Sequence, residues 1–155
     1  MADLARTVLH AQIEAEGVAI RTLDPAAQFL VTGAPPLAPN TLADFFPYSL
    51  WLAPDRTLVV YETQRGEPSG RFISDVTDGF VLIELVGPRA GELVAASTSI
   101  DPSNAILAPG RCIQTLFGGV KVVLYAYGHG FRLHAERQFA AFLLAWLRQA
   151  ASALG

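Results

Sequence analysis

The first hydrophobic and polar positions of the chain recur at helical spacing. Leu4, Val8 and Ala11 would lie on one side of a helix. Gly17 suits the position that follows a helix, because glycine adopts the left-handed backbone conformation at low cost. We therefore predict a helix over residues 3–16.

The next apolar runs are short and predict strands. VAIRTL and AQFLVTG flank Asp24-Pro25 and are each long enough for one strand. Three prolines between positions 33 and 40 remove backbone donors, so we expect residues 33–47 to form a loop. SLWLA and TLVVYE, joined across Pro54-Asp55, predict a hairpin.

The densest signals lie between Arg71 and Phe117. The runs RFISD and FVLIELV flank Asp78-Gly79, a dipeptide that readily supplies the positive φ angles of a type I′ turn, so we predict a hairpin. Pro88 suits the first turn of a helix, where its missing N–H has no intrahelical partner. PRAGELVAAS therefore predicts a helix, and RCIQTLF predicts a further strand after an irregular stretch.

Glycine turns and a long apolar helix complete the pattern. Gly118-Gly119 joins RCIQTLF to VKVVLYAY, and Gly128-His129-Gly130 joins that run to FRLHA, so we expect an antiparallel meander with two- and three-residue turns. A terminal helix is predicted over residues 136–153. Its main apolar stripe comprises Phe139, Phe142, Leu143, Trp146, Leu147 and Ala150.

A second apolar face of the same helix lies outside that stripe. It comprises Ala141, Leu144 and Ala145. A helix that packs on one sheet needs an apolar arc of only about 100°, so one sheet cannot cover both faces. We predict that this second face contacts a partner chain and that the isolated protein self-associates.

These elements predict an α+β fold in one domain over residues 1–155. Hairpins alternate with helices, which favours a mostly antiparallel sheet with helices to one side. We divide the domain into a short N-terminal lobe, residues 1–47, and a main unit, residues 48–155. A chain of 155 residues is long enough to bury a sizeable core.

Composition narrows the possible partners. The chain is 52% hydrophobic and only 16% charged, with a net charge of −3, so little charge is available to cover its surface. An apolar surface that meets another protein is the expectation. The sequence has no basic cluster for nucleic acid, no apolar run of membrane-spanning length and no signal peptide, so we expect a cytoplasmic protein.

A long string of motifs resembles a known family. SDVTDGFVLIELVGPRAGELVA, followed by PGRCIQTL, is similar to the DVSDG, strand, GPRA, helix and PGRCAQTL succession of the gamma subunit of heterotetrameric sarcosine oxidase. SLWLAPDRTLVV and the C-terminal stretch from Phe131 through Trp146-Leu147 agree, so the resemblance covers about residues 49–153. The segment 33–47 is shorter than its counterpart in the family, where a helix is expected, so the N-terminal lobe is abbreviated.

The resemblance implies a fold and a function. The family's fold is similar to part of the folate-binding fold of the glycine-cleavage T-protein. The complex demethylates sarcosine oxidatively to glycine, forms hydrogen peroxide and passes the one-carbon unit to tetrahydrofolate. This chain would be a non-catalytic accessory subunit of that complex, bound chiefly to the alpha subunit, with beta and delta also present. The flavins and NAD would lie in those partner subunits.

Two other functions stay open. A stand-alone folate-binding, one-carbon-transfer protein like the T-protein is the competing class, although the chain is less than half that protein's length. A divergent relative that serves another N-methyl amine oxidase is the other. Adjacent genes for alpha, beta and delta subunits would favour the accessory subunit.

The candidate chemical residues give little support for catalysis or metal binding. Cys112 with His129 or His134 could form a nucleophile and base, but nothing indicates hydrogen-bond reach between them. One cysteine and three scattered histidines include no short-spaced metal-ligand pair, and no G-x-G-x-x-G follows a strand. We therefore predict no catalytic residue, no cofactor site and no metal site in this chain.

Four charged residues remain to be assigned. Asp75 and Asp78 could be an acid–base pair, but both flank a predicted turn, where aspartate commonly bonds backbone N–H groups. Arg89 at a helix start and Arg111 at a strand start could grip an acidic partner. We predict interface roles for Arg89 and Arg111, together with Ala141, Leu144 and Ala145.

Overall fold

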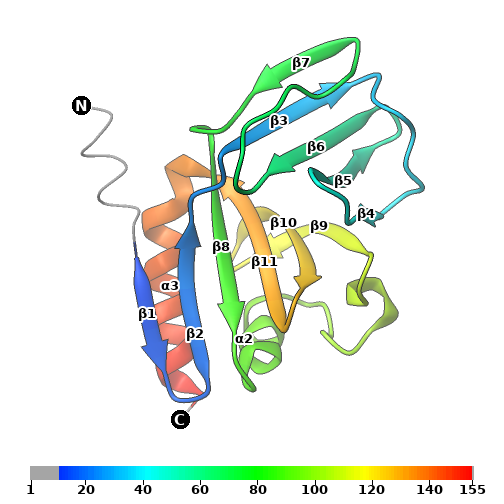
Figure 1. The fold of residues 1–155 in the computed structure, drawn as a ribbon. Helices are drawn as coiled ribbons and strands as arrows, with labels where there is room; N and C mark the ends of the chain where they lie inside the picture. Colours follow the sequence, from blue (N-terminus) through cyan, green and yellow to red (C-terminus); the bar gives the residue numbers. More distant parts are fainter. Residues whose placement is uncertain (1–10, 155) are drawn as a thin grey trace.

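The computed structural model describes residues 11–154, which form two antiparallel sheets and two helices. The six-stranded sheet has the order β1-β2-β8-β11-β10-β9, and the five-stranded sheet has the order β4-β5-β6-β3-β7 (Figure 1). The strands are β1 Gln12–Ala15, β2 Val18–Leu23, β3 Ala27–Thr32, β4 Leu42–Ala43, β5 Tyr48–Ala53, β6 Arg56–Tyr61, β7 Phe72–Asp75, β8 Phe80–Val86, β9 Cys112–Phe117, β10 Val120–Tyr127 and β11 Gly130–Glu136. The helices are α2 Ala90–Ser97 and α3 Ala140–Ala153, with 3₁₀ turns η1 Ala105–Leu107 and η2 Arg137–Phe139.

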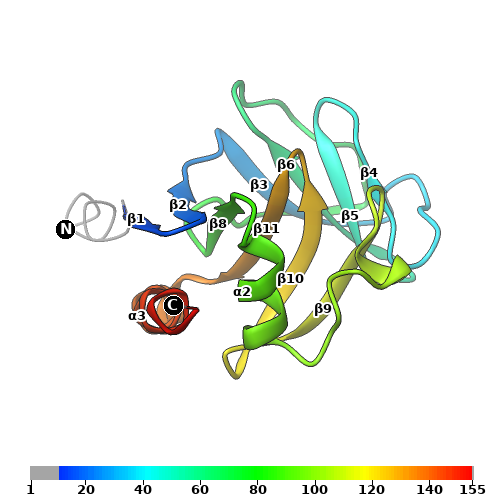
Figure 2. The same ribbon diagram turned by 90° about the horizontal axis from the view of Figure 1, so that it is seen from below.

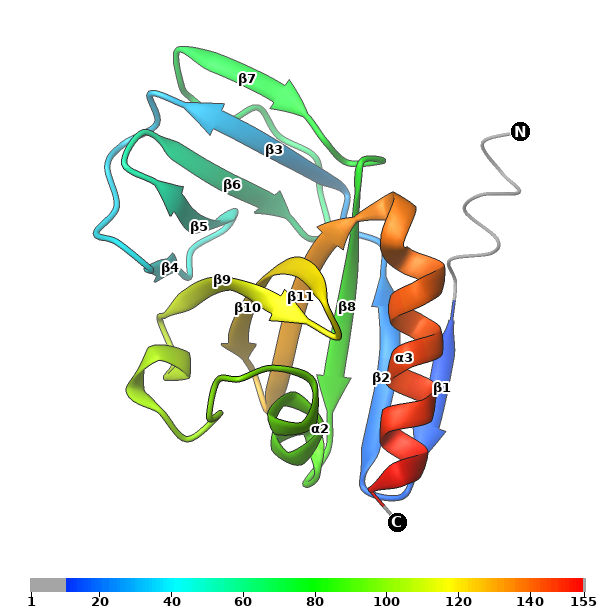
Figure 3. The ribbon, with the colours of Figure 1, turned by 180° about the vertical axis from the view of Figure 1, so that it is seen from behind.

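The elements form three layers. Helices α2 and α3 cover one face of the six-stranded sheet, and the five-stranded sheet lies against part of the other face (Figures 2 and 3). Alternate residues of one strand therefore enter different cores. In β10, Val122 and Leu124 join the helix-side core, whereas Val123 and Tyr125 join the core between the sheets. The six-stranded sheet is thus covered on both sides, and the space between the two sheets contains the site described below.

The antiparallel α+β class is confirmed, with two sheets in place of one. Every strand pair among the described residues is antiparallel. The meander β9-β10-β11 and the hairpin β5-β6 form as predicted. Both meander turns have two residues, since Phe117 pairs with Val120 and Tyr127 pairs with Gly130.

The predicted hairpin across Asp78-Gly79 is wrong. Strand β7 pairs with β3 in one sheet, while β8 pairs with β2 and β11 in the other. Neither Asp78 nor Gly79 has a positive φ, and the N–H groups of Gly79 and Phe80 both donate to the carbonyl of Val76. The physical reason is burial, because β8 is apolar on both faces and takes a central position that the exposed β7 could not share.

The predicted helix over 3–16 is wrong where it can be compared, since residues 3–10 lie outside the described part. Residues 12–15 are strand β1, which pairs with β2 across Gly17. Gly17 has φ of 85°, and this conformation serves a hairpin turn as well as a helix end. The predicted loop 33–47 holds, apart from the two-residue strand β4.

The terminal helix begins later than predicted. Strand β11 extends to Glu136, η2 follows, and α3 starts at Ala140. The predicted division of its faces is also wrong for three positions. Leu144 is buried in the helix-side core with 8% exposed, whereas Phe139 and Phe142, both assigned to the main stripe, are 38% and 54% exposed. In the described residues no helix is long and apolar enough to cross a membrane.

Candidate functional site

A row of polar side chains crosses the six-stranded sheet on the face toward the other sheet. The strand register places Arg21 opposite Glu84, Glu84 opposite Arg132, and Arg132 opposite Tyr125. Because these residues alternate with apolar neighbours that face the helices, all four side chains lie on the opposite face of the sheet, where Arg21 is half exposed and the other three enter the space between the sheets. We call these residues, with Gln28, Tyr48, Glu62, Tyr127 and His134, the polar layer.

Two guanidinium groups and two carboxylates balance within the polar layer. Arg132 donates from Nε to Glu84 Oε2 at 3.2 Å and from Nη1 to Glu62 Oε2 at 3.2 Å. Arg21 pairs with the other oxygen of Glu84. The Arg132 guanidinium also lies 3.9 Å from the centroid of the Tyr127 ring, and the Tyr127 hydroxyl donates to Glu62 at 2.6 Å. The buried cation is therefore paired on several sides, as its removal from water requires.

A chain of hydrogen bonds continues from Arg132 through two tyrosines to a histidine. Arg132 Nη1 donates to the Tyr48 hydroxyl at 3.3 Å. The Tyr48 and Tyr125 hydroxyls lie 2.6 Å apart, and the Tyr125 hydroxyl lies 2.6 Å from His134 Nε2. The other ring nitrogen, Nδ1, lies 2.6 Å from Gln28 Oε1. The chain of hydrogen bonds contains residues from both sheets and crosses between them at Tyr48 and at Gln28, so it holds the sheets together.

The direction of these bonds follows from Gln28. Its Nε2 faces the carbonyl oxygens of Thr77 at 3.5 Å and Phe80 at 3.4 Å, which can only accept, so Oε1 faces His134. Nδ1 of His134 therefore carries a proton and donates it, which leaves Nε2 of the neutral ring to accept from Tyr125. The Tyr125 oxygen in turn accepts from Tyr48. Each group in the chain has a defined role.

Burial sets the protonation states of this chain. His134 is fully buried, and the loss of water together with nearby Arg132 lowers its pKa to about 3. Burial raises the pKa of Tyr125 well above its ordinary value. It also raises the pKa of Tyr48, although the contacts with Tyr125 and Arg132 act in the opposite direction. The imidazole and both hydroxyls are therefore neutral near pH 7.

The arrangement is suited to stability and not to proton transfer with a substrate. Both ring nitrogens of His134 are engaged inside the protein, and the hydroxyls of Tyr48 and Tyr125 are buried with it. No cluster of three His, Cys, Asp or Glu residues within 11–154 could hold a metal ion. A fully satisfied polar network of this kind rigidifies the core and specifies one packing of the two sheets.

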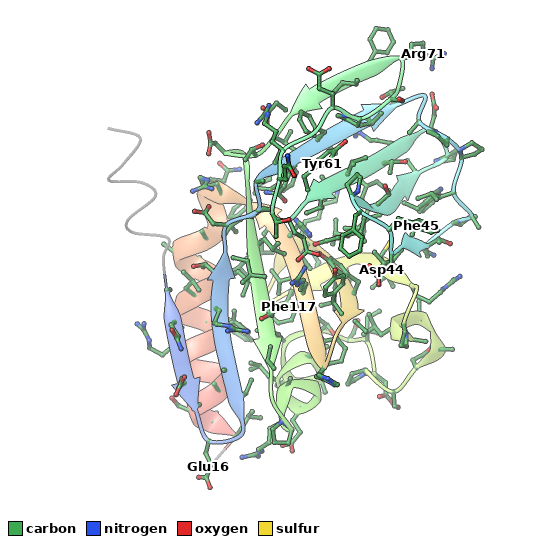
Figure 4. All side chains as sticks on the ribbon, in the orientation of Figure 1. Glu16, Asp44, Phe45, Tyr61, Arg71 and Phe117 are labelled. Atoms are coloured by element: carbon green, nitrogen blue, oxygen red, sulfur yellow. The ribbon has the colours of Figure 1, made fainter. Side chains whose placement is uncertain are left out.

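Two open clefts border the five-stranded sheet near its β4–β5 end. One, of about 390 Å³, is lined by Phe46, Tyr48 and Tyr61 together with Glu62 and Arg65. The other, of about 450 Å³, lies on the outer face of the sheet. Phe45 and Tyr61 line its floor and edge, and both can be followed in Figure 4.

The two arginines predicted at an interface contact different parts of the fold. Arg89 precedes α2, pairs with Glu92 and donates to the carbonyl of Leu154, which ties α2 to the end of α3. Arg111 lies beside Thr41 in an isolated bridge, and no described residue forms an ion pair with it. Ala141 and Ala145 are exposed on α3, whereas Leu144 is buried. The interface roles of these residues stay predictions.

The residues rejected as a catalytic set lie apart. Cys112 is buried where β9 meets the five-stranded sheet, with Sγ 3.5 Å from the carbonyl oxygens of Thr41 and Trp51. Burial raises its pKa to about 11. His134 lies inside β11. The structure brings neither His134 nor the exposed His129 into hydrogen-bond contact with Cys112.

Asp75 has the predicted turn role. It accepts hydrogen bonds from the backbone N–H and the hydroxyl of Thr77 and pairs with Arg65. The Thr77 hydroxyl first, and Arg65 after it, lower its pKa to about 2. The Thr77 hydroxyl oxygen also accepts from the backbone N–H of Gln28 at 3.0 Å, so this turn supports the last member of the polar layer.

Sequence reasoning missed the polar layer, although a signal was present. Glu84 interrupts the apolar run FVLIELV, and Arg132 and His134 stand two positions apart in FRLHAE. Polar residues at alternate positions of an otherwise buried strand indicate a shared face that needs partners. The partners could not be read from the chain, since Gln28 and His134 are 106 positions apart.

Comparisons with known proteins agree with one family. The model of the "Sarcosine oxidase, gamma subunit family" matches residues 36–153. A solved structure of heterotetrameric sarcosine oxidase from Corynebacterium sp. U-96, in complex with pyrrole 2-carboxylate, contains a chain similar to this one, with a TM-score of 0.78 and 22% identity. The likeness covers 97% of this chain and 92% of that chain and establishes the shared fold. No curated protein matches.

Proposed function

The chain belongs to the sarcosine oxidase gamma subunit family, and we propose that it is a non-catalytic accessory subunit of a sarcosine oxidase-type complex. In this proposal, the complex is cytoplasmic and contains partner subunits of the alpha, beta and delta types, among which the flavins and NAD are bound. Those subunits convert sarcosine to glycine and peroxide and pass the one-carbon unit to tetrahydrofolate. This chain supports the assembly, chiefly through the alpha-type subunit.

The family match over residues 36–153 carries the proposal, because it includes strands β4 to β11 and both helices. The polar layer supports an accessory role. His134 lines a cleft of about 410 Å³ beside Gln114 and Glu136, but both of its ring nitrogens are bonded to Tyr125 and Gln28 inside the protein. The buried charged groups likewise form ion pairs with one another. Chemistry on a substrate would need groups that are free to meet it.

The proposal is tested by purifying the chain alone and together with the larger subunits. Alone, it should show no flavin absorption and release no peroxide from sarcosine. With the larger subunits it should form a complex of fixed stoichiometry. A stoichiometric yellow chromophore on the isolated chain, or peroxide formation by it, would contradict the accessory role.

A calorimetric titration with tetrahydrofolate separates this proposal from the T-protein-like function. The two clefts beside the five-stranded sheet are open to solvent, whereas small-molecule sites usually bury about 70–90% of a drug-sized ligand. We expect no saturable binding to the isolated chain. Saturable binding at sub-micromolar concentration would favour the folate-binding alternative.

A further inference from the structure

Two adjacent phenylalanines form the most exposed large apolar feature in the described part of the chain. Phe45 is 75% exposed and Phe46 is 95% exposed. We call Phe45 and Phe46 the aromatic tip. It lies between β4 and β5, with Phe46 lining the first of the two clefts described above and Phe45 lining the second. Phe45 and its neighbour Asp44 are labelled in Figure 4.

The scaffold holds the aromatic tip in place from both sides. Leu42 precedes it and is buried opposite Leu50, and Tyr48 follows it and is buried in the polar layer. The N–H of Phe45 also donates to the carbonyl of Ala43. A backbone segment that is already fixed at both ends loses little conformational freedom on binding, so exposed aromatic residues carried on it are efficient anchors.

The surroundings of the aromatic tip are acidic. Asp44 and Glu62 both face the Tyr127 hydroxyl, and Glu67 lies beside Tyr61. Glu62 is paired with Arg132, but no described residue forms an ion pair with Asp44 or Glu67. The nearby base Arg65 is neutralised by Asp75. Among the described residues, the two carboxylates near the aromatic tip that form no ion pair, Asp44 and Glu67, therefore outnumber the unpaired Arg111 beside Thr41.

This charge selects among possible occupants. Two copies of the chain that met tip to tip would bring like charges together, and an anionic membrane surface would be repelled for the same reason. A basic surface with an apolar pocket would complement the aromatic tip in both charge and shape. Arg and aromatic side chains are the groups that most often carry the binding energy of such contacts.

We infer that the aromatic tip is the anchor by which this chain docks on a larger subunit, in an apolar pocket bordered by Lys or Arg. The inference rests on the proposed function, because it takes the partner to be a subunit of the same complex. It places the docking surface on the five-stranded sheet. This is a different surface from the α3 face of Ala141 and Ala145 predicted above.

The test compares variants in the complete complex, co-expressed with the larger subunits of the same organism. Phe45→Ser/Phe46→Ser should weaken association at least about 30-fold, as expected for the loss of a central aromatic anchor. Phe72→Ser is the matched control, because Phe72 is also exposed, at 66%, but lies on the edge strand β7. It should bind as the wild type does, and both variants should keep the wild-type melting temperature.

The acidic residues give an independent readout. Asp44→Asn/Glu67→Gln should slow association at low salt and flatten its dependence on salt concentration, since charges at the border of an interface act mainly on the association rate. These substitutions leave the aromatic tip intact. An unchanged salt dependence would contradict the basic character that we assign to the partner's pocket.

The outcomes separate the two proposals. If the wild type joins the complex and the double phenylalanine variant joins it with unchanged affinity, the inference is overturned and the accessory role stands. If the wild type does not join the larger subunits at all, both are overturned. If the isolated wild type forms a dimer that the double variant does not form, the occupant is a second copy and the inference is wrong.

Discussion

Protonation of His134 should make the protein unstable in mild acid. In the folded chain, burial and nearby Arg132 lower the pKa of His134 to about 3, from an ordinary value of 6.5. The unfolded state therefore binds a proton between these two values that the folded state does not bind. The sign follows directly, since stability from this residue is fully present above pH 6.5 and is lost as the pH falls toward 3.

The magnitude can be worked from those two values. Each pH unit inside the window changes the free energy of unfolding by about 1.4 kcal/mol, so lowering the pH from about 7.5 to about 5 should cost about 2 kcal/mol. For a chain of this length, that corresponds to a fall in the melting temperature of about 4–8 °C. The protonated ring would also have to donate from Nε2 to Tyr125, which would reverse the direction of the hydrogen-bond chain.

Urea unfolding at a series of pH values measures this effect for wild type and for His134→Gln. The variant should be less stable near pH 7.5, by about 1–3 kcal/mol, because Tyr125 and Gln28 lose a well-placed partner. Its own loss of stability between pH 7.5 and pH 5 should be about 2 kcal/mol smaller than that of the wild type. The two proteins should therefore converge in stability as the pH falls.

His129→Gln is the matched control, because His129 is exposed in the turn between β10 and β11. Its imidazole stays in contact with water in both states, so this variant should follow the wild-type pH curve. The reasoning is refuted if His134→Gln loses as much stability between pH 7.5 and pH 5 as the wild type does. It is refuted equally if His129→Gln removes the pH dependence.

Two further substitutions test the burial of single residues. Leu144→Asp should lower the free energy of unfolding of the isolated chain by about 3–5 kcal/mol, because it puts an unpaired carboxylate into the helix-side core. Ala145→Asp, on the exposed side of α3, should change it by less than about 0.5 kcal/mol. Similar melting temperatures for the two variants would contradict the assigned faces. Cys112, whose pKa burial raises to about 11, should react with a thiol reagent at pH 8 only after denaturation, and complete reaction in the native protein would contradict its burial.

The sequence predicts most strands of this fold and few of their long-range pairings. Strands such as β5 and β6 are set by local alternation and a short turn, so they were recognisable as a hairpin. The hairpin across Asp78-Gly79 failed because a local turn signal cannot show which sheet each strand enters. The mostly apolar sequence of β8 did carry that information, since a strand buried on both faces needs neighbours on both edges.

The candidate site was harder to predict for a related reason. Glu84, Arg132 and His134 were visible as polar residues in buried strands, but each is stabilised by partners from distant segments. The aromatic tip was missed because residues 33–47 have no periodicity from which exposure could be judged. A loop that joins two buried anchors can present its side chains rigidly, and only the positions of Leu42 and Tyr48 in the core reveal this.

Tyr48 belongs to the polar layer and closely follows the aromatic tip in the chain, so the buried polar groups can fix the position of the tip. Apolar contacts between two sheets are not directional, so they would tolerate small sliding of one sheet over the other. The hydrogen bonds from Tyr48 to Tyr125 and from His134 to Gln28 have fixed partners, and each shift in register would leave a buried group unsatisfied. The five-stranded sheet is thereby held in one position on the rest of the domain. The aromatic tip, which ends two residues before Tyr48, is therefore also held in one position. Docking into a preformed pocket of another subunit requires such a fixed position.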